Sequence, residues 1–145
     1  MARASYLEQN SGVSKLKLKV ENVTAARTLT ANDSGKIFTL DQDASFDITL
    51  PTAANAGAGW HAKFILTDAG SGTVKVIPDS SEDTLIGMIA PADDGTAGAS
   101  AESGVDELIW VASTAAPGDW AELMCDGSNY YVYGVMHDND HMTLA

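Results

Sequence analysis

The sequence predicts an all-β domain, a jelly-roll-like β-sandwich, and three observations favour this class. Short apolar or alternating runs recur along the chain, and Gly, Asp, Asn, Ser and Pro separate them. A helical period of apolar residues is hard to find. With 145 residues, of which 45% are hydrophobic, the chain can bury the core of a single domain without disulfides. About nine short strands in one domain are typical of a sandwich or jelly roll.

We expect three segments: an N-terminal arm over 1–14, the sandwich over 15–136 and a solvated tail over 137–145. The large apolar residues of the leader 1–12 are Tyr6 and Leu7. The first expected strand, 15–20, is amphipathic, because successive side chains of a strand point to opposite faces. Its polar face comprises Lys15, Lys17 and Lys19, and its apolar face comprises Leu16, Leu18 and Val20.

A turn follows at 30–36, where "TANDSGK" supplies residues that tolerate the backbone angles of a tight reversal. The run 37–41 predicts a strand, and so does 45–51, which Pro51 ends. We expect the second of these strands to present one apolar face, made of Phe46, Ile48 and Leu50.

The loop 52–61 is rich in small residues and can hold one short helical turn. Strands 61–68 and 73–78 follow, and the Gly-rich turn between them, 69–72, predicts a β-hairpin. A further short strand is expected at 83–89.

The segment 90–104 contains no large apolar residue, which predicts a long exposed loop. After it, alternating runs predict a β-meander of three strands, at 106–113, 120–126 and 130–136.

The charge is unevenly distributed, and this excludes some partners. The chain carries a formal charge of −12; residues 1–75 have a net charge of +1, and the last 70 residues have −13 and no cation. An acidic body of this kind repels phosphate backbones, so nucleic acid is not an expected partner. No apolar run approaches the roughly 20 residues of a membrane helix, so no membrane partner is expected.

The sequence offers weak candidates for chemistry, and we expect no enzyme, no catalytic residue and no cofactor. The single Cys125 is expected as a small buried thiol, and no triad or nucleotide motif accompanies His61. A polysaccharide hydrolase would need two facing carboxylates, and the sequence shows no such pairing. The best metal candidate is the tail motif "HDNDH", which could converge on the axis of a trimer, although a solvated acidic tail is the favoured interpretation. Its possible ligands are His137, Asp138, Asp140 and His141.

Aromatic residues could form a sugar-binding platform. Trp110 lies among apolar residues and is expected in the core, whereas Trp120 begins a strand and is expected to be half buried. Trp60, beside a Gly-rich loop, is the tryptophan we expect to be exposed. At least one of Tyr130, Tyr131 and Tyr133 should pack inside.

Three segments together carry a resemblance: "LTANDSGKIFTLDQDASFDITLP" at 29–51, "KFILTDAG" at 63–70 and "GDWAELMCDGSNYYVYG" at 118–134. The chain resembles the capsid decoration (cement) proteins of tailed bacteriophages and related domains of phage fibres. The residues that match the family pattern lie in the first turn (Asp33, Ser34, Gly35), at the entry to the penultimate strand (Gly118, Asp119, Trp120) and in the last hairpin (Asp126, Gly127, Tyr131). Departures from the pattern are Cys125, where the family usually has Ser, and Tyr130, where it often has Trp.

The resemblance implies a β-sandwich that forms homotrimers on the outer surface of a phage head, with the major capsid protein as partner. The virion is then the expected location. An alternative of a different class is a tail-fibre or head-fibre module that binds a host-surface glycan. The expected structural turn residues are Asp33, Gly35, Gly118, Asp119 and Gly127.

The lysines of strand 15–20 have two interpretations. They can guard an exposed sheet edge against aggregation, as lysines often do. They can also form a basic docking face for an acidic partner, with the leader ordering on binding. The expected partner-binding residues are Tyr6, Leu7, Lys15, Lys17 and Lys19.

Overall fold

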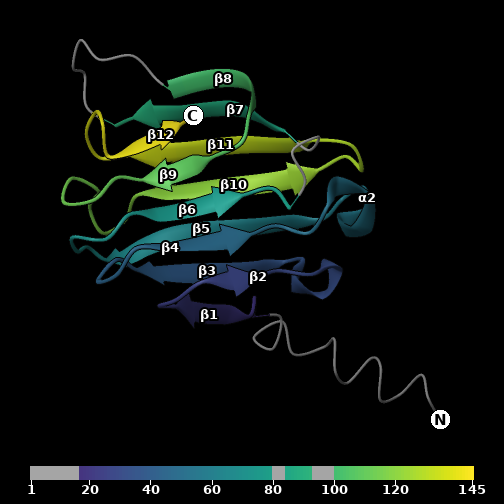
Figure 1. Ribbon diagram of the computed structural model, residues 1–145, viewed down its shortest axis with the longest axis horizontal. Helices are drawn as coiled ribbons and strands as arrows, with labels where there is room; N and C mark the ends of the chain where they lie inside the picture. The colour runs from purple at the N-terminus through teal and green to yellow at the C-terminus, as the bar shows by residue number, and fades with distance from the viewer. Residues whose placement is uncertain (1–16, 80–83, 93–99) are drawn as a thin grey trace.

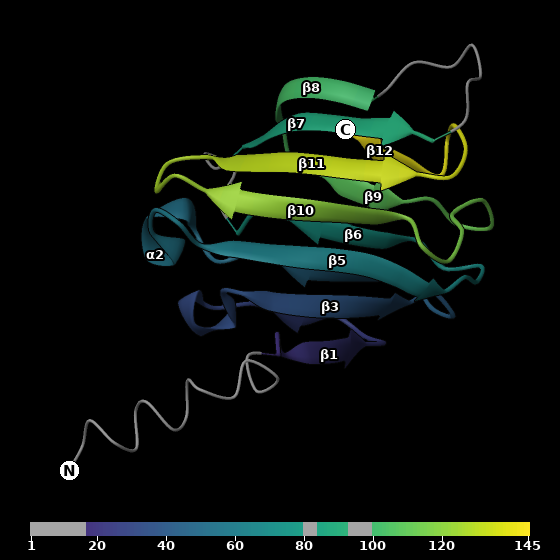
Figure 2. The same cartoon turned by 180° about the vertical axis from the view of Figure 1, so that it is seen from behind.

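The computed structural model describes residues 17–79, 84–92 and 100–145, which form a β-sandwich of two sheets (Figures 1 and 2). The predicted all-β class is therefore confirmed. Sheet A has the spatial order β1 (Val20–Val23), β3 (Lys36–Asp41), β5 (His61–Asp68), β10 (Trp120–Cys125), β11 (Tyr130–Met136), β7 (Leu85–Pro91) and β8 (Ser100–Val105). Sheet B has the order β12 (Met142–Leu144), β9 (Leu108–Trp110), β6 (Val74–Ile77), β4 (Phe46–Thr49) and β2 (Arg27–Thr28).

The first half of the chain winds back and forth between the two sheets. Strands β1, β3 and β5 pair in parallel in sheet A, and β2, β4 and β6 pair in parallel in sheet B. The strands of a jelly roll pair antiparallel, so this winding differs from the jelly-roll-like connectivity expected from the sequence. The difference arises because each of these strands leads across the sandwich instead of folding back on its neighbour.

The predicted hairpin of 61–68 and 73–78 is wrong in its pairing, although both strands exist. Strand β5 belongs to sheet A and β6 to sheet B. The link between them passes against the 42–44 backbone, where a Cβ on Gly72 would lie 2.2 Å from the carbonyl carbon of Ala44. Gly72 thus permits a close approach of two backbone segments, whereas the Gly-rich sequence 69–72 predicted a hairpin turn.

The predicted β-meander is correct in one of its two pairings. Strands β10 and β11 form an antiparallel hairpin, whereas β9 lies in sheet B between β6 and β12. The expected loop 90–104 also needs correction, because β8 (Ser100–Val105) pairs antiparallel with β7. Residues 93–99 lie outside the described residues.

The predicted solvated tail is wrong for its last residues. Met142 and Leu144 are buried, and β12 pairs with β9 at the end of sheet B. Their alternation with Thr143 follows the period of a strand, with the apolar side chains turned to the core.

The core lies between the inner faces of the two sheets. Phe38 and Phe64 stack at its centre with ring centroids 5.2 Å apart, and Trp110 packs on Phe64 at 6.4 Å. Phe46 and Ile48 are buried as expected. Among the described residues, the helical elements are a 3-10 turn, Ala31–Asp33, and an α-helical turn, α2 (Ala53–Ala56). No helix in the described part of the chain has the length to cross a membrane.

Trp60 is not exposed as predicted; only 2% of its surface is accessible. Its ring packs edge-on against Tyr130 at 5.7 Å, and its Nε1–H donates a hydrogen bond to the carbonyl oxygen of Thr30 at 3.2 Å. Cys125 is buried, Trp110 is in the core and Trp120 is partly buried, as expected.

The first strand begins later than predicted, at Val20, where the expected strand 15–20 ends. Leu18 and Val20 do not form a buried apolar face, because 62% and 57% of their surfaces are exposed. The arm 1–14 and the candidate residues Tyr6, Leu7 and Lys15 lie outside the described residues.

Candidate interaction surface

The outer face of sheet A is built from side chains that strand register places in rows. Positions opposite one another in neighbouring strands point to the same face. The central row, read from β1 to β7, comprises Val20, Ile37, Lys63, Glu122, Tyr133 and Met88. The next row comprises His61, Met124, Tyr131 and Ile86.

This face gathers the exposed apolar side chains of the described residues. Six large hydrophobic residues are exposed in that part of the chain, and each lies on the outer face of sheet A or directly before β1. They are Leu18, Val20, Met88, Met124, Tyr131 and Tyr133. Contiguous exposed apolar surface of this kind marks an interaction site more often than a chance arrangement.

A groove of about 410 Å³ runs along this face between β1 and β11. Leu18 and Ile37 line it on one side, and Met124, Tyr131 and Tyr133 on the other. The hydroxyl of Tyr131 donates a hydrogen bond to Asp126 Oδ2 at 3.1 Å, which fixes the ring and raises the pKa of that tyrosine. The groove is thus apolar along its walls, with its aromatic rim held in place.

Lys63 and Glu122 place a pair of opposite charges in the middle of the face. Lys63 Nζ is 3.7 Å from Oε1 of Glu122 on the neighbouring strand. The same ammonium group lies 3.9 Å from the centroid of the Trp120 ring, a cation–π arrangement. Trp120 in turn packs edge-on against Tyr133, with centroids 6.1 Å apart. The Lys63 ammonium group therefore contacts both a carboxylate and an aromatic ring, which fix its position.

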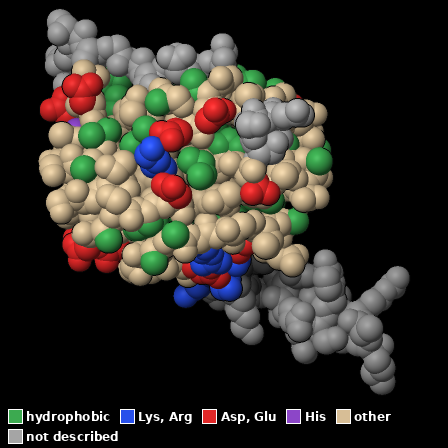
Figure 3. Space-filling model, viewed as in Figure 1, with side chains coloured by type: hydrophobic (Ala, Val, Ile, Leu, Met, Phe, Trp, Pro, Cys, Tyr) green, Lys and Arg blue, Asp and Glu red, His purple; other side chains and the backbone are tan. Residues whose placement is uncertain are grey.

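The outer face of sheet B has a different character. Figure 3 views this side and shows Lys, Arg, Asp and Glu side chains interspersed across it and along its lower edge. Lys75 reaches both carboxylate oxygens of Glu107 at 2.9 Å, and Asp47 lies in the same row of positions as Lys75. The two faces thus differ, with charge pairs on sheet B and apolar side chains on sheet A.

The predicted lysine strand contributes to a charge cluster at the β1 end of the molecule. Glu21 is its centre and lies 2.6 Å from Lys19 Nζ, 2.7 Å from Arg27 Nη2 and 3.0 Å from Lys36 Nζ. Lys19, followed by Lys36 and Arg27, lowers the pKa of Glu21 to about 2. Lys17 is exposed. Part of the expected basic face is thus neutralised by a carboxylate of its own strand.

Asp33 and Gly35 form the turn that the sequence indicated. Asp33 accepts hydrogen bonds from the backbone N–H and the hydroxyl of Thr30, at 2.8 and 3.1 Å, and from Lys36 at 2.6 Å. Burial raises the pKa of Asp33, but these hydrogen bonds outweigh it, so the pKa lies below its ordinary value. Gly35 has a φ of 80°, which favours glycine.

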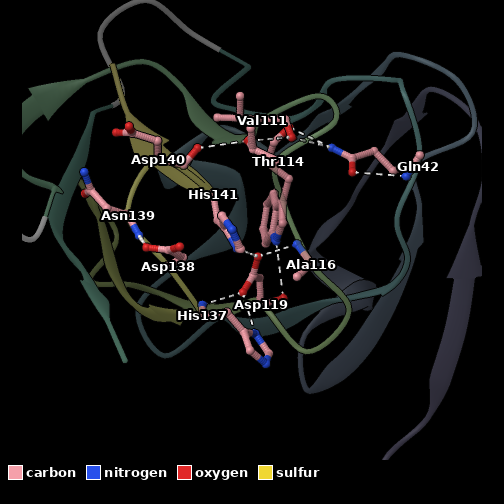
Figure 4. Close-up of polar contacts among 12 residues, drawn as sticks. Gln42, Val111, Thr114, Ala116, Asp119, His137, Asp138, Asn139, Asp140 and His141 are labelled. Carbon is pink, nitrogen blue, oxygen red and sulfur yellow. Dashed lines mark hydrogen bonds and ion pairs between the residues drawn. The ribbon is translucent and has the colours of Figure 1, made fainter. Parts of the chain in front are cut away.

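Asp119 is a buried carboxylate with four hydrogen-bonding contacts (Figure 4). Its Oδ1 accepts from the backbone N–H of His137 at 2.7 Å and lies 3.0 Å from that residue's Nδ1. Its Oδ2 accepts from the N–H of Ala116 at 2.7 Å and lies 3.0 Å from Nδ1 of His141. We name Asp119, His137 and His141 the carboxylate clamp, because they join the loop before β10 to the segment between β11 and β12.

The two remaining turn glycines are also required by geometry. Gly118 has a φ of 102°, and a Cβ there would lie 3.0 Å from Cε1 of His137. Gly127 has a φ of 96°, and its N–H donates to the sulfur of Cys125 at 3.3 Å. Both positions favour glycine because other residues rarely adopt these backbone angles.

The structure does not assemble the candidate metal ligands of the tail. Within residues 17–79, 84–92 and 100–145, no three His, Cys, Asp or Glu side chains are placed to hold a metal ion. His137 and His141 contact Asp119 instead, and Asp138 and Asp140 are exposed. Between these two aspartates, the backbone N–H of Asn139 donates a hydrogen bond to Asp138 Oδ1 at 2.7 Å.

Sequence reasoning missed the outer face of sheet A as a site. A signal for it exists in the runs 120–125 and 130–136, where both alternating faces carry large apolar residues. Cys125 and Tyr130 point inward, whereas Met124 and Tyr131 point outward. A strand that is apolar on both faces predicts burial on both, and here one face is exposed in the isolated chain.

Comparisons with known proteins found no matching family model, no similar curated protein and no similar solved structure.

Proposed function

We propose that this chain is a structural virion protein, a capsid decoration protein that binds the outer surface of a phage head as a homotrimer and stabilises the lattice. The observation that supports the proposal most directly is the exposed apolar face of sheet A, which is suited to protein–protein contact. The sequence resemblance at 29–51, 63–70 and 118–134 is the reason for proposing that the protein is part of a phage virion.

The mechanism of stabilisation is additive binding. A trimer places three equivalent contacts on several capsid subunits, so the second and third contacts form at a high effective concentration. Binding to the assembled lattice, and not to its separated subunits, shifts the equilibrium towards the lattice. The charged cluster around Glu21, with Lys17 exposed beside it, supplies the polar contact to an acidic capsid surface.

The copy number of the protein in purified virions tests this proposal. Quantitative mass spectrometry against the major capsid protein measures it directly. Hundreds of copies in a simple ratio to the capsid protein are the expected result. A few copies per particle would contradict lattice decoration.

The alternative, a fibre module that binds a host glycan, retains one supporting observation. Tyr131 and Tyr133 line the groove of sheet A, and Trp120 packs on Tyr133. Aromatic rings in such a position can stack on a sugar. A few copies per virion, together with glycan binding that is lost on Tyr133→Ala, would favour this function over decoration.

A further inference from the structure

We propose that the outer face of sheet A is a self-association surface, occupied by a second copy of this chain. The inference goes beyond the proposed homotrimer, because a self-complementary contact has twofold symmetry and joins two chains, or two trimers, as a pair. Three properties of the face carry it: the concentration of apolar side chains, the shape of the face and the distribution of charge.

The first property is apolar area that nothing in the described chain covers. Met124 and Tyr133 have 55% and 53% of their surfaces exposed at the centre of a seven-stranded sheet. Neither residue is needed by the core, because the alternate positions of β10 and β11 fill it. Removing these side chains from water favours association.

The second property is shape. Projecting side chains and a groove lie next to one another on the same face, since Met124 and Tyr133 project from the wall of the groove that Leu18 and Ile37 close. A face that contains both a projection and a hollow can pack on a second copy of itself, each projection entering the hollow of the other.

The third property is charge. Two copies that each carry −12 repel one another wherever their acidic surfaces meet. The groove is an exception, because the Lys, Arg, Asp and Glu side chains that line it are Lys36, Lys63 and Glu122. A cationic and an anionic side chain lie side by side at its centre, so Lys63 can face Glu122 of the second copy while Glu122 faces Lys63 of that copy. This reciprocity fits a second copy of the chain better than an unrelated partner.

A pair of glutamate substitutions tests the surface. Met88→Glu with Met124→Glu places two acids on the outer face of sheet A at exposed positions. The matched control, Thr28→Glu with Thr143→Glu, places two acids on the outer face of sheet B. The full-length chains are compared by light scattering and sedimentation equilibrium over a range of concentrations, with urea unfolding as a check that each is folded.

The wild type is expected to have a mass that is an even multiple of the 15.1 kDa of one chain, because the contact joins copies in pairs. The sheet A variant is expected to associate at least about tenfold more weakly than the wild type, and the sheet B control to match the wild type. A folded sheet A variant with unchanged association would overturn the proposal, and so would a wild type that stays at one chain at every concentration.

Charge reversal gives a second, independent test. Lys63→Glu leaves two acids at the centre of the face, and Glu122→Lys leaves two cations. Each variant alone is expected to associate weakly, whereas an equal mixture of the two is expected to associate as the wild type does. A mixture no tighter than the separate variants would contradict the reciprocal pairing.

These results are separable from a failure of the proposed function. A wild-type dimer that dissociates on Met88→Glu with Met124→Glu supports the surface and contradicts the homotrimer. A trimer whose association is unchanged by those substitutions contradicts the proposed surface and is consistent with the homotrimer. The copy number in virions is measured without reference to either.

Discussion

Nδ1 of His141 lies 3.0 Å from Oδ2 of Asp119, and this contact fastens the last strand of the chain to the loop before β10. Asp119 has no exposed surface, and each of its carboxylate oxygens has two hydrogen-bonding contacts within the protein. A buried carboxylate is stable only when hydrogen bonds replace the water it has lost. The carboxylate clamp therefore holds the segment before β12 against the loop before β10.

Asp119→Asn should destabilise the protein by about 3 kcal/mol. The amide nitrogen would replace an acceptor and face the N–H of Ala116 or of His137, leaving a buried donor without a partner. Urea unfolding measures the change in free energy. Asp138→Asn, at an exposed position of the same segment, is the control and should change it little. Equal stabilities of the two variants would contradict the role of the clamp.

Glu21→Gln should lower stability at neutral pH and reduce its dependence on pH in acid. Lys19, followed by Lys36 and Arg27, holds the pKa of Glu21 at about 2 in the folded chain, against an ordinary value of 4.5. A depressed pKa stabilises the fold fully above pH 4.5, and this contribution disappears as the pH falls towards 2.

The free energy of unfolding of Glu21→Gln and of the wild type, measured from pH 2 to pH 7, checks this expectation. The two curves should converge at the acid end and separate as the pH rises. Asp43→Asn, which removes an exposed carboxyl group in a turn, serves as the control. Parallel curves for Glu21→Gln and the wild type would show that the ion pairs do not stabilise the fold.

Gly72→Ala should destabilise the protein by about 3 kcal/mol, because the new methyl group would overlap the backbone of Ala44. The clash lies at the crossing between the sheets, where the backbone of 42–44 is fixed by the hydrogen bond from Gly72 N–H to the carbonyl oxygen of Gln42 at 2.9 Å. Ser71→Ala, next to it and exposed, is the matched control. A thermal unfolding temperature equal to that of the control would exclude the close approach.

Replacing Lys15, Lys17 and Lys19 with Gln should weaken binding to capsids and flatten its dependence on salt, because screening acts on charge pairs. Co-sedimentation with capsids lacking the protein, at several salt concentrations, measures the effect. Lys17→Gln and Lys75→Gln form a matched pair, since each removes a single charge, at the β1 end or on sheet B. Equal binding of that pair would locate the capsid contact elsewhere.

Local pattern predicted the strands well and their partners poorly. The run 61–68 was predicted as a strand with the bounds that β5 has, because its alternation is a local property. Its pairing with 73–78 was wrong, because the choice between a hairpin and a crossing depends on the distant backbone of 42–44. Trp60 was placed outside for a similar reason: its burial depends on Tyr130, 70 positions away in the sequence.

The candidate surface could also be predicted only where it depends on residues close together in the sequence. Asp33, Gly35, Gly118 and Gly127 were identified as turn residues from short motifs, and the structure places each in a turn or cap that requires it. The row from Val20 to Met88 could not be found in this way, since it is assembled from six strands whose spatial order does not follow the sequence. Only the strand register brings Lys63, Glu122 and Tyr133 together.

The alternation of the first six strands between the sheets has a consequence for how the protein acquires its structure. No two consecutive strands among β1–β6 pair with each other, so each pairing must wait for the chain to travel to the opposite sheet and return. Local hairpins exist only later in the described chain, at β7–β8 and β10–β11. Pairings between distant residues slow folding. We therefore expect these hairpins to form early, and the parallel pairings among β1–β6 to form last and slowly. A newly made N-terminal half would then expose unpaired strand edges until residues beyond 100 have left the ribosome, and this interval is when the chain is most prone to aggregate.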